Sequence, residues 1–172
     1  QALPGMGVKP GDRIATLAWN THRHLELYYA VSGIGAVLHT VNPRLFPEQI
    51  EYIVNHAEDT LLFLDPTFVP LVQKLAPALR SVQKLILLAT SEQTQAAQAS
   101  LPGLLCYDAL LAGHSPKWSW PELSESQASS LCYTSGTTGN PKGVLYSHRS
   151  TVLHAWASCA ADSLALSSQD SV

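Results

Sequence analysis

The sequence predicts an α/β fold built on a parallel, doubly wound sheet with flanking helices. Two observations predict this fold. Over residues 1–89, short apolar runs alternate with segments in which apolar residues recur at helical spacing. The apolar runs lack the polar alternation of a half-exposed strand, so we expect strands that are buried on both faces. Helices on both sides of a parallel sheet are the arrangement that buries such strands.

The first predicted strand, residues 11–19, begins with a turn and becomes apolar, as buried strands do. Asn20 and Thr21 can both cap a helix, which we predict over residues 21–32. Residues 36–41 predict the next strand. One face of the predicted helix carries Leu25, Tyr28, Tyr29 and Ser32.

Two further helices and two further strands are predicted before position 90. Pro47 suits the first turn of a helix because its φ is already fixed. The buried stripe of this helix is predicted to be Ile50, Ile53, Val54 and Ala57. Residues 60–64 form a short apolar strand, and Asp65 caps a second helix that ends near Pro77. The stripe of the second helix is Phe68, Leu71, Val72 and Leu75. Residues 84–89 predict a strand.

The segment that follows is predicted to cross the surface. Residues 90–102 are rich in Gln, Ala and Ser, which favours a surface connection with a frayed helix. Residues 107–111 favour a helical turn. We expect Trp118 and Trp120 to pack against the body of the protein, and a ligand platform is the alternative.

The last part of the chain is predicted to form a strand, a loop, a strand and a helix. The strands are expected at residues 129–134 and 143–146, and the helix at about residues 150–166. The core stripe of this helix is predicted to be Leu153, Trp156, Ala157, Ala160 and Leu164. The chain is thereby divided into an alternating strand and helix layer at 1–89, a connection at 90–121, and the strand, loop, strand and helix at 122–172.

Between the last two strands, the sequence TSGTTGNPKG concentrates hydrogen-bond donors around one lysine, Lys142. Its hydroxyl residues are Thr134, Ser135, Thr137 and Thr138, and its glycines are Gly136, Gly139 and Gly143. Glycines let backbone N–H groups approach an anion closely, hydroxyl groups add donors, and a lysine adds a flexible positive charge. The Asn140-Pro141 pair fixes where the chain leaves the turn. We therefore predict a loop that binds the phosphates of a polyphosphate.

Two other nucleotide motifs do not fit this sequence. The P-loop of NTPases opens a helix, whereas Lys142 is followed by Gly143 and by residues expected to be extended. A dinucleotide-binding motif needs its glycines directly after a strand, whereas Gly33 and Gly35 follow a predicted helix. A plain turn is the remaining alternative, and it needs fewer hydroxyl groups than this loop contains.

The sequence TSGTTGNPKG resembles the signature of the adenylate-forming (AMP-binding) superfamily at every position. This superfamily comprises acyl-CoA synthetases, peptide-synthetase adenylation domains and luciferases. Residues 17–59 are also similar to the N-terminal part of bacterial medium- and long-chain fatty-acid CoA ligases. The resemblance implies that residues 1–172 are a partial N-terminal AMP-binding domain, part of the large domain of an acyl-CoA synthetase-like fold.

The resemblance also implies a site and a reaction. It assigns the binding of ATP to Thr134, Ser135, Gly136, Thr137, Thr138, Gly139 and Lys142, with Lys142 as the catalytic residue. It implies ATP, Mg²⁺ and CoA as cofactors, and a carboxylic acid, expected to be a fatty acid, as the substrate. The acid would become an acyl-adenylate and then pass to CoA. The segment of Asn42, Pro43, Arg44 and Leu45 matches one that begins a helix in the family, so we expect a structural role for it.

Several motifs of the family have no counterpart in this sequence. They are the adenine-binding motif, the ribose-binding aspartate, the hinge and the catalytic lysine of the C-terminal domain. We therefore expect the chain to belong to a longer protein, to need the remainder of that protein as a partner, and to be inactive by itself. The first residue is Gln1 rather than Met, which favours the same expectation. The alternatives are another adenylate-forming enzyme, of the peptide-synthetase or luciferase kind, and an inert piece that only packs.

Composition excludes several classes of partner. The 172 residues carry a formal net charge of -3, so no nucleic-acid partner is expected. No apolar run approaches the roughly 18 residues that a membrane-spanning helix needs. No signal peptide is recognised either, and a cytoplasmic protein is therefore expected.

The cysteines and histidines do not predict a disulfide framework or a metal site. The cysteines, Cys106, Cys132 and Cys159, are odd in number and far apart, and we expect buried thiols. His22 and His24 are two positions apart on the predicted helix, so they face different directions and cannot chelate one ion. His148 is predicted to make a structural hydrogen bond, and contact with the phosphates is the alternative.

Overall fold

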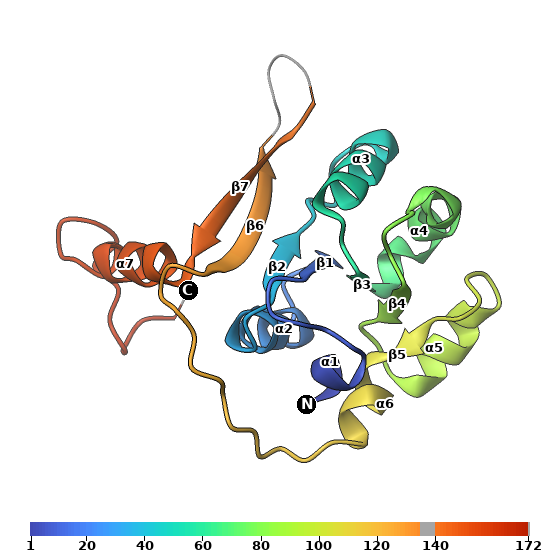
Figure 1. The fold of residues 1–172 in the computed structure, drawn as a ribbon, viewed down its shortest axis with the longest axis horizontal. Coiled ribbons are helices and arrows are strands. Elements are labelled where there is room, and N and C mark those ends of the chain that lie inside the picture. The colour runs from blue at the N-terminus through green and yellow to red at the C-terminus, as the bar shows by residue number, and fades with distance from the viewer. Residues whose placement is uncertain (135–139, 172) are drawn as a thin grey trace.

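The structure is a computed structural model that describes residues 1–134 and 140–171. Its strands form one sheet in the order β5-β4-β3-β1-β2-β6-β7 (Figure 1). The strand bounds are β1 Arg13–Leu17, β2 Val37–Thr40, β3 Leu61–Leu64, β4 Lys84–Leu87, β5 Leu105–Cys106, β6 Ala128–Thr134 and β7 Lys142–Ser147. Strands β1 to β6 pair in parallel, and β7 pairs with β6 in antiparallel orientation. The predicted parallel sheet is confirmed, with one antiparallel strand at its edge.

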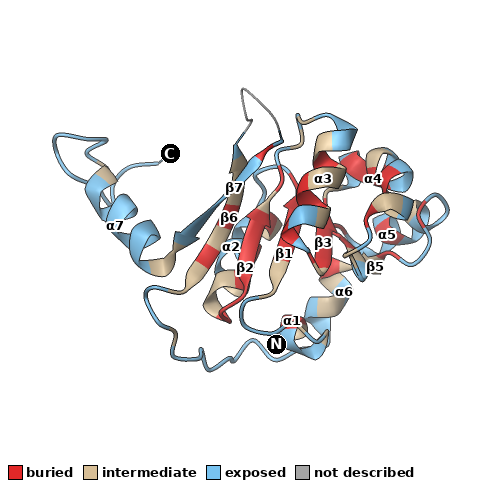
Figure 2. Cartoon of the chain, turned by 45° about the horizontal axis from the view of Figure 1, so that its top comes forward, coloured by how far each residue is buried: buried red, intermediate tan, exposed pale blue. Residues whose placement is uncertain are grey.

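Helices cover both faces of this sheet. Their bounds are α1 Ala2–Gly5, α2 His22–Gly33, α3 Pro47–Ala57, α4 Val69–Leu75, α5 Ser91–Gln98, α6 Tyr107–Ala112 and α7 His148–Ser158, with short 3-10 helices at Pro66–Phe68 and Ala76–Ala78. Helices α3, α4 and α5 pack on one face, and α1, α2 and α6 pack on the other. Figure 2 shows the buried residues concentrated in β1, β2 and β3 and in the helices α3 and α4. The predicted doubly wound α/β class is confirmed.

Helix α3 forms as its sequence predicts. The side-chain oxygen Oε1 of Gln49 accepts a hydrogen bond from the N–H of Phe46 at 3.1 Å, which closes the first turn. Pro47 occupies that turn. The predicted stripe is buried, and its members are Ile50, Ile53, Val54 and Ala57. Burying one such aliphatic side chain stabilises the fold by roughly 1.5 to 3 kcal/mol, so the stripe fixes α3 on the sheet.

Helix α2 begins where predicted. The face of α2 that was named from the sequence carries its exposed large side chains. Thr21 Oγ1 accepts a hydrogen bond from the N–H of His24 at 3.4 Å, which confirms the predicted cap. The residues buried against the sheet are His24, Leu27 and Val31. The exposed large side chains are Leu25, Tyr28 and Tyr29. Both sets have helical spacing, so periodicity alone does not predict which face of α2 is buried. The buried face is the one that packs on Ile14 and Phe63.

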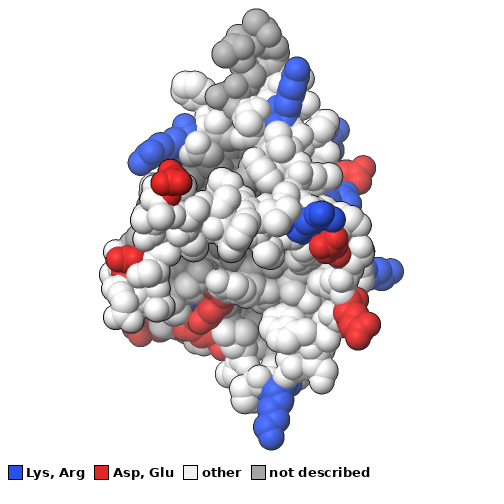
Figure 3. All heavy atoms as spheres, turned by 90° about the vertical axis from the view of Figure 1, so that its left-hand side faces the viewer, with Lys and Arg blue, Asp and Glu red and all other residues white. Residues whose placement is uncertain are grey.

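Helix α7 differs from the prediction in length and in burial. It ends at Ser158 rather than near residue 166, and none of its residues is buried. The predicted core stripe is exposed, at Leu153, Trp156, Ala157, Ala160 and Leu164. In Figures 1 and 2, α7 lies beyond β7 and away from the rest of the sheet. Periodicity predicts where an apolar stripe lies, but burial needs a second surface, and none of the described elements supplies one. Figure 3 shows this side of the molecule, where the charged side chains are scattered and uncharged atoms make up most of the surface.

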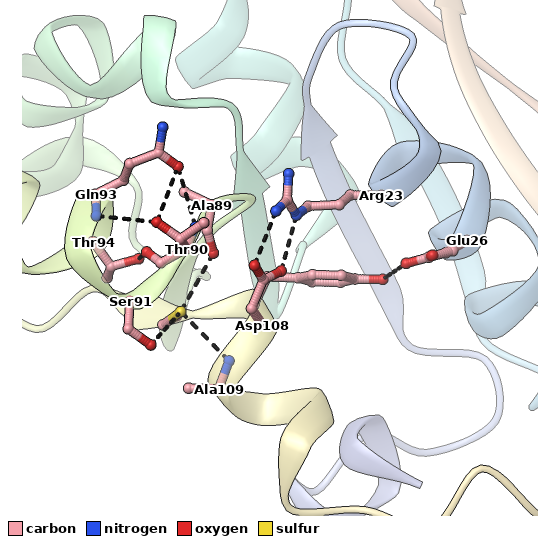
Figure 4. Close-up of polar contacts among 11 residues, drawn as sticks. Arg23, Glu26, Ala89, Thr90, Ser91, Gln93, Thr94, Asp108 and Ala109 are labelled. Atoms are coloured by element: carbon pink, nitrogen blue, oxygen red, sulfur yellow. Dashed lines mark hydrogen bonds and ion pairs between the residues drawn. The ribbon is translucent and has the colours of Figure 1, made fainter.

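Residues 90–102 contain a regular helix, α5, where a frayed one was expected. Thr90 and Gln93 close its N-terminus reciprocally (Figure 4). The N–H of Gln93 donates to Thr90 Oγ1 at 3.4 Å, and the N–H of Thr90 donates to Gln93 Oε1 at 3.2 Å. Most of the segment is exposed, as expected of a surface connection, and Thr94 and Leu101 are the residues that are buried. The reciprocal cap compensates for the polar composition of this helix.

The cysteines are free, but they are not the buried thiols that were expected. Cys106 and Cys132 are half-buried, and Cys159 is exposed. Cys106 lies at the sheet edge, where its thiol donates to the carbonyl oxygen of Ala89 at 3.3 Å. Burial acts to raise the pKa of this thiol, and hydrogen bonds, the strongest from the N–H of Ala109, outweigh it, so that the pKa lies below its ordinary value.

Of the two tryptophans of the connection, Trp120 contacts the body of the protein. The ring of Trp120 lies so close to Gly33 that an added Cβ would stand 2.5 Å from a ring carbon. Trp120 is nevertheless 59% exposed, and Trp118 is 38% exposed. The expected packing is therefore confirmed for Trp120, whose ring carbons lie against Gly33.

A polar cluster ties α6 to α2 (Figure 4). The Nε and Nη2 groups of Arg23 each donate to one carboxylate oxygen of Asp108, both at 2.9 Å. The hydroxyl of Tyr107 donates to Glu26 Oε2 at 2.6 Å. The hydrogen bond from Arg23 holds the pKa of the Asp108 carboxyl below its usual range. These contacts fix the middle of the connection on helix α2, which lies far away in the sequence.

We expect Asp108→Asn to lower the free energy of unfolding of the chain by roughly 0.5 to 1 kcal/mol at pH 7, because the ion pair is partly exposed. The pKa of Asp108 is lower in the folded state than in the unfolded state. Its stabilisation is therefore present above the unfolded pKa and is lost as the pH falls through the folded pKa. Urea unfolding should show the difference between the two variants at pH 7 and lose it in strong acid.

The matched control is Glu125→Gln. Glu125 and Arg149 also form an ion pair, but the side chains are 67% and 63% exposed, so we expect almost no change in stability. An Asp108→Asn variant that is as stable as the parent at pH 7 would contradict the role given to this pair.

Candidate functional site

The candidate loop leaves the sheet at the carboxyl edge of its parallel strands. Strand β6 runs parallel to β2, with Cys132 opposite Thr40, so Thr134 lies at the edge where β2 also ends. Ligands of open α/β sheets bind outside this edge. Strand β7 then returns in antiparallel orientation and pairs Lys142 with Thr134. The loop joins two strands, as predicted.

Two of the predicted phosphate ligands flank the loop. The hydroxyl of Thr134 donates to the carbonyl oxygen of Lys142 at 3.5 Å, and both residues are exposed. Within residues 1–134 and 140–171, Lys142 takes part in no ion pair. An exposed ammonium group without a neighbouring carboxylate can pair with a phosphate oxygen. The other predicted ligands lie outside the described residues, and they are Ser135, Gly136, Thr137, Thr138 and Gly139.

Tyr133, the residue before Thr134, is held from three sides. Its ring lies 5.1 Å from the ring of His39, centroid to centroid. Its hydroxyl lies 2.7 Å from Nδ1 of His56. Across the hairpin it faces Gly143, where an added Cβ would stand 3.1 Å from Cζ of the tyrosine. Burial raises the pKa of Tyr133 to about 12, so the hydroxyl keeps its proton at neutral pH and can donate to His56.

A buried pair supports the His39 side of this arrangement. His39 Nδ1 and Asp59 Oδ2 are 2.6 Å apart, and both side chains are fully buried. Burial raises the pKa of Asp59, and the hydrogen bond with His39 acts in the opposite direction. Arg13 closes the turn next to Asp59, because its Nε donates to the carbonyl oxygen of Ala57 at 2.6 Å. The imidazole that contacts Tyr133 therefore has a fixed orientation.

No motif in the sequence predicts these supporting residues. A signal did exist for two of them, because His39 and Asp59 are polar residues in or beside apolar segments. Buried polar side chains need partners, so each of the two points to the other. Tyr133 and His56 carry no such signal, since their contact joins positions 77 residues apart.

His148 lies away from the loop. It begins α7, at the opposite end of β7 from Lys142. Its backbone N–H donates to the carbonyl oxygen of Gln127 at 3.0 Å, whereas its ring Nε2 is buried and has no partner among the described residues. The ring lines a cavity of about 370 Å³ between α2 and the start of α7, together with Tyr28 and Ser130. The structural hydrogen bond predicted for the His148 side chain is therefore not found among the described residues, and only the backbone of His148 makes one.

The described part of the chain contains neither a cluster of metal ligands nor a membrane-spanning helix. No group of three or more His, Cys, Asp and Glu side chains is arranged there to hold a metal ion. None of the helices in that part combines the length and the apolar character needed to cross a membrane.

The family model described as AMP-binding enzyme matches residues 1–172. The chain therefore belongs to the AMP-binding enzyme family. This membership confirms the resemblance that the loop sequence suggests.

The chain is similar to several CoA ligases. It is 56% identical over 170 residues to a 3-methylmercaptopropionyl-CoA ligase of Ruegeria pomeroyi. It is 53% identical over 171 residues to a medium-chain-fatty-acid–CoA ligase of Ectopseudomonas oleovorans. Each match covers 99% of this chain and 31% of the relative, so the chain spans less than a third of the length of these relatives.

The fold also matches solved structures. An anthranilate CoA ligase, AuaEII, in complex with anthranoyl-AMP has a TM-score of 0.81 at 23% sequence identity. The match covers 90% of this chain and 28% of that one. This likeness confirms the α/β fold.

Proposed function

We propose that this chain is part of an ATP-dependent acid–CoA ligase, which activates a carboxylic acid as an acyl-adenylate and transfers the acyl group to CoA. One observation carries the proposal: the chain is more than half identical to CoA ligases over 99% of its length. The exposed Thr134 and Lys142 at the carboxyl edge of the sheet support the phosphate-binding part of it. The activity belongs to the whole protein, of which this chain supplies one part of the site.

In this proposal, a carboxylate oxygen of the acid attacks the α-phosphorus of ATP. The bond from that phosphorus to the bridging oxygen breaks, and pyrophosphate leaves with the electron pair. Lys142 and residues 134–139 bind the β- and γ-phosphates, and Lys142 neutralises the charge that grows on the leaving group. Bound Mg²⁺ supplies further neutralisation of the phosphates. The acyl group then passes from AMP to the thiol of CoA, with release of AMP.

The acid is proposed to be aliphatic. Support comes from the likeness of residues 17–59 to fatty-acid CoA ligases and from the medium-chain relative. The name of the other relative also denotes an aliphatic acyl group. A peptide-synthetase or luciferase-like enzyme would share the loop and is the competing function.

The same proposal covers organisation and location. We place residues 1–172 in the large N-terminal domain of the enzyme, with residues 1–89 as the alternating layer, 90–121 as the connection and 122–172 as the unit that carries the loop. A cytoplasmic location is part of the proposal, and the cysteines, which are odd in number and far apart and do not indicate a disulfide framework, support it.

The complete protein should catalyse ATP–pyrophosphate exchange in the presence of aliphatic acids, and it should form aliphatic acyl-CoA when CoA is added. A panel of aliphatic, aryl and amino acids, read out by exchange and by mass spectrometry of the thioester, checks this expectation. Exchange that depends on amino acids or aryl acids and ignores aliphatic acids would favour the competing function.

Lys142→Ala in the complete protein should weaken the use of ATP about 10- to 100-fold, because a charge-assisted hydrogen bond contributes roughly 1.5 to 3 kcal/mol. The KM for the acid should stay nearly unchanged, since the lysine contacts only the phosphates in this proposal. Lys74→Ala, on the exposed side of α4, removes the same charge elsewhere and is the control. An unchanged dependence on ATP in Lys142→Ala would remove this residue from the mechanism.

The chain by itself should catalyse no adenylation. Positioning of the α-phosphate against the acid needs groups from several segments, and this chain supplies only the phosphate loop. ATP–pyrophosphate exchange with purified chain and a fatty acid should therefore equal the control without protein. Exchange that is above this control and is abolished by Lys142→Ala would show that the chain already contains a working site.

A further inference from the structure

Tyr133 stands at the junction of three elements around the candidate phosphate site. It precedes Thr134 on β6, and its partner across the hairpin, Gly143, follows Lys142 on β7. Its hydroxyl reaches His56 on α3. The Tyr133 side chain therefore adjoins the residues on both sides of the loop.

We propose that Tyr133 and His56 are positioning residues for this site. Their hydrogen bond, together with the packing of the Tyr133 ring between His39 and Gly143, holds Thr134 and Lys142 where they meet the phosphates of the nucleotide. The inference rests on the proposed function. Neither residue is assigned contact with the nucleotide.

The ring of Tyr133 has little freedom to move. On one side it meets the imidazole of His39, which the buried Asp59 fixes at 2.6 Å. On the other side it covers Gly143, where an added Cβ would lie 3.1 Å from Tyr133 Cζ and 3.2 Å from Leu131 Cδ1. A side chain at position 143 would push the ring away, so the glycine provides the space that the ring occupies. The two strand ends are therefore packed together through this ring.

The hydroxyl of Tyr133 connects the hairpin to a rigid helix. His56, which accepts or donates at 2.7 Å, also stacks on Tyr52 with ring centroids 5.3 Å apart. Helix α3 is itself fixed by buried Ile53 and Val54. Within the described residues, no strand pairs with the outer side of β7, so the sheet does not support the hairpin there. Helix α3 supports the hairpin instead, through the Tyr133 hydroxyl. Because His56 is exposed, we expect a modest contribution from this hydrogen bond.

The test measures the KM for ATP, the KM for the acid and the thermal stability of variants of the complete protein. Tyr133→Phe keeps the ring and removes the hydroxyl, and it should raise the KM for ATP about 3- to 10-fold. Tyr133→Leu also removes the ring and should raise this KM further. In both variants the KM for the acid should stay within about twofold, and Tyr133→Phe should unfold at nearly the same temperature as the parent.

A double-mutant cycle tests the pair. His56→Phe keeps the stack on Tyr52 and should match Tyr133→Phe, and the double variant should be no worse than either single one, because all three lack the same hydrogen bond. Tyr52→Phe is the control. It removes a hydroxyl from the same helix, and this hydroxyl makes no hydrogen bond to any described residue.

Two outcomes would overturn the inference. In one, Tyr133→Leu and His56→Phe leave the KM for ATP within twofold of the parent. In the other, the KM values for ATP and for the acid rise together with a large loss of thermal stability, which is the result of a purely structural role. Failure of the proposed function is distinguishable from both, because the parent protein itself would then show no acid-dependent exchange.

Discussion

The parallel pairing of β6 with β2 is the contact on which the candidate site depends. It sets Cys132 beside Thr40 and so brings the end of β6 to the carboxyl edge of the sheet. Strand β7 pairs with β6 and, in the described chain, with no other strand. The position of Lys142 therefore depends on the position of β6. The pairing is costly to break, because each lost ladder bond would leave backbone groups of the buried strand β2 without partners.

Much of the fold could be predicted because it follows from local chemistry. Pro47 and the apolar stripe of α3 act within a few turns, and Thr21 caps α2 through the next residues of the chain. The order of the strands could not be predicted in this way, since it depends on contacts between distant segments. The prediction that α7 is buried was wrong for the same reason. Trp156 has helical spacing with its apolar neighbours, but spacing does not provide a surface on which they can pack.

The candidate site also contains residues that local sequence predicts and residues that only the folded chain brings together. Its loop could be predicted because glycines, hydroxyl groups and Lys142 lie together in the sequence. The residues that support the loop come from β2, from α3 and from the turn before β3, and their contacts exist only in the folded chain. His39 and Asp59 are buried together, and this burial makes their hydrogen bond valuable, because neither side chain has access to water. Local patterns thus predict the groups that would touch a ligand and leave out those that hold them.

Gly143 has one further consequence, which concerns the alignment of the two strands of the hairpin. A slip of two residues would place Pro141 or Leu145 opposite Tyr133, where a Cβ alone would lie about 3.1 Å from the ring and the ring would have to move. A slip of one residue would turn β7 over and exchange its two faces. The loop consists of whatever lies between the paired strands, so the alignment also decides how many residues it contains. Gly143 thereby fixes the number of residues in the loop. Substitutions within the loop can then change its chemistry without changing the position of Lys142.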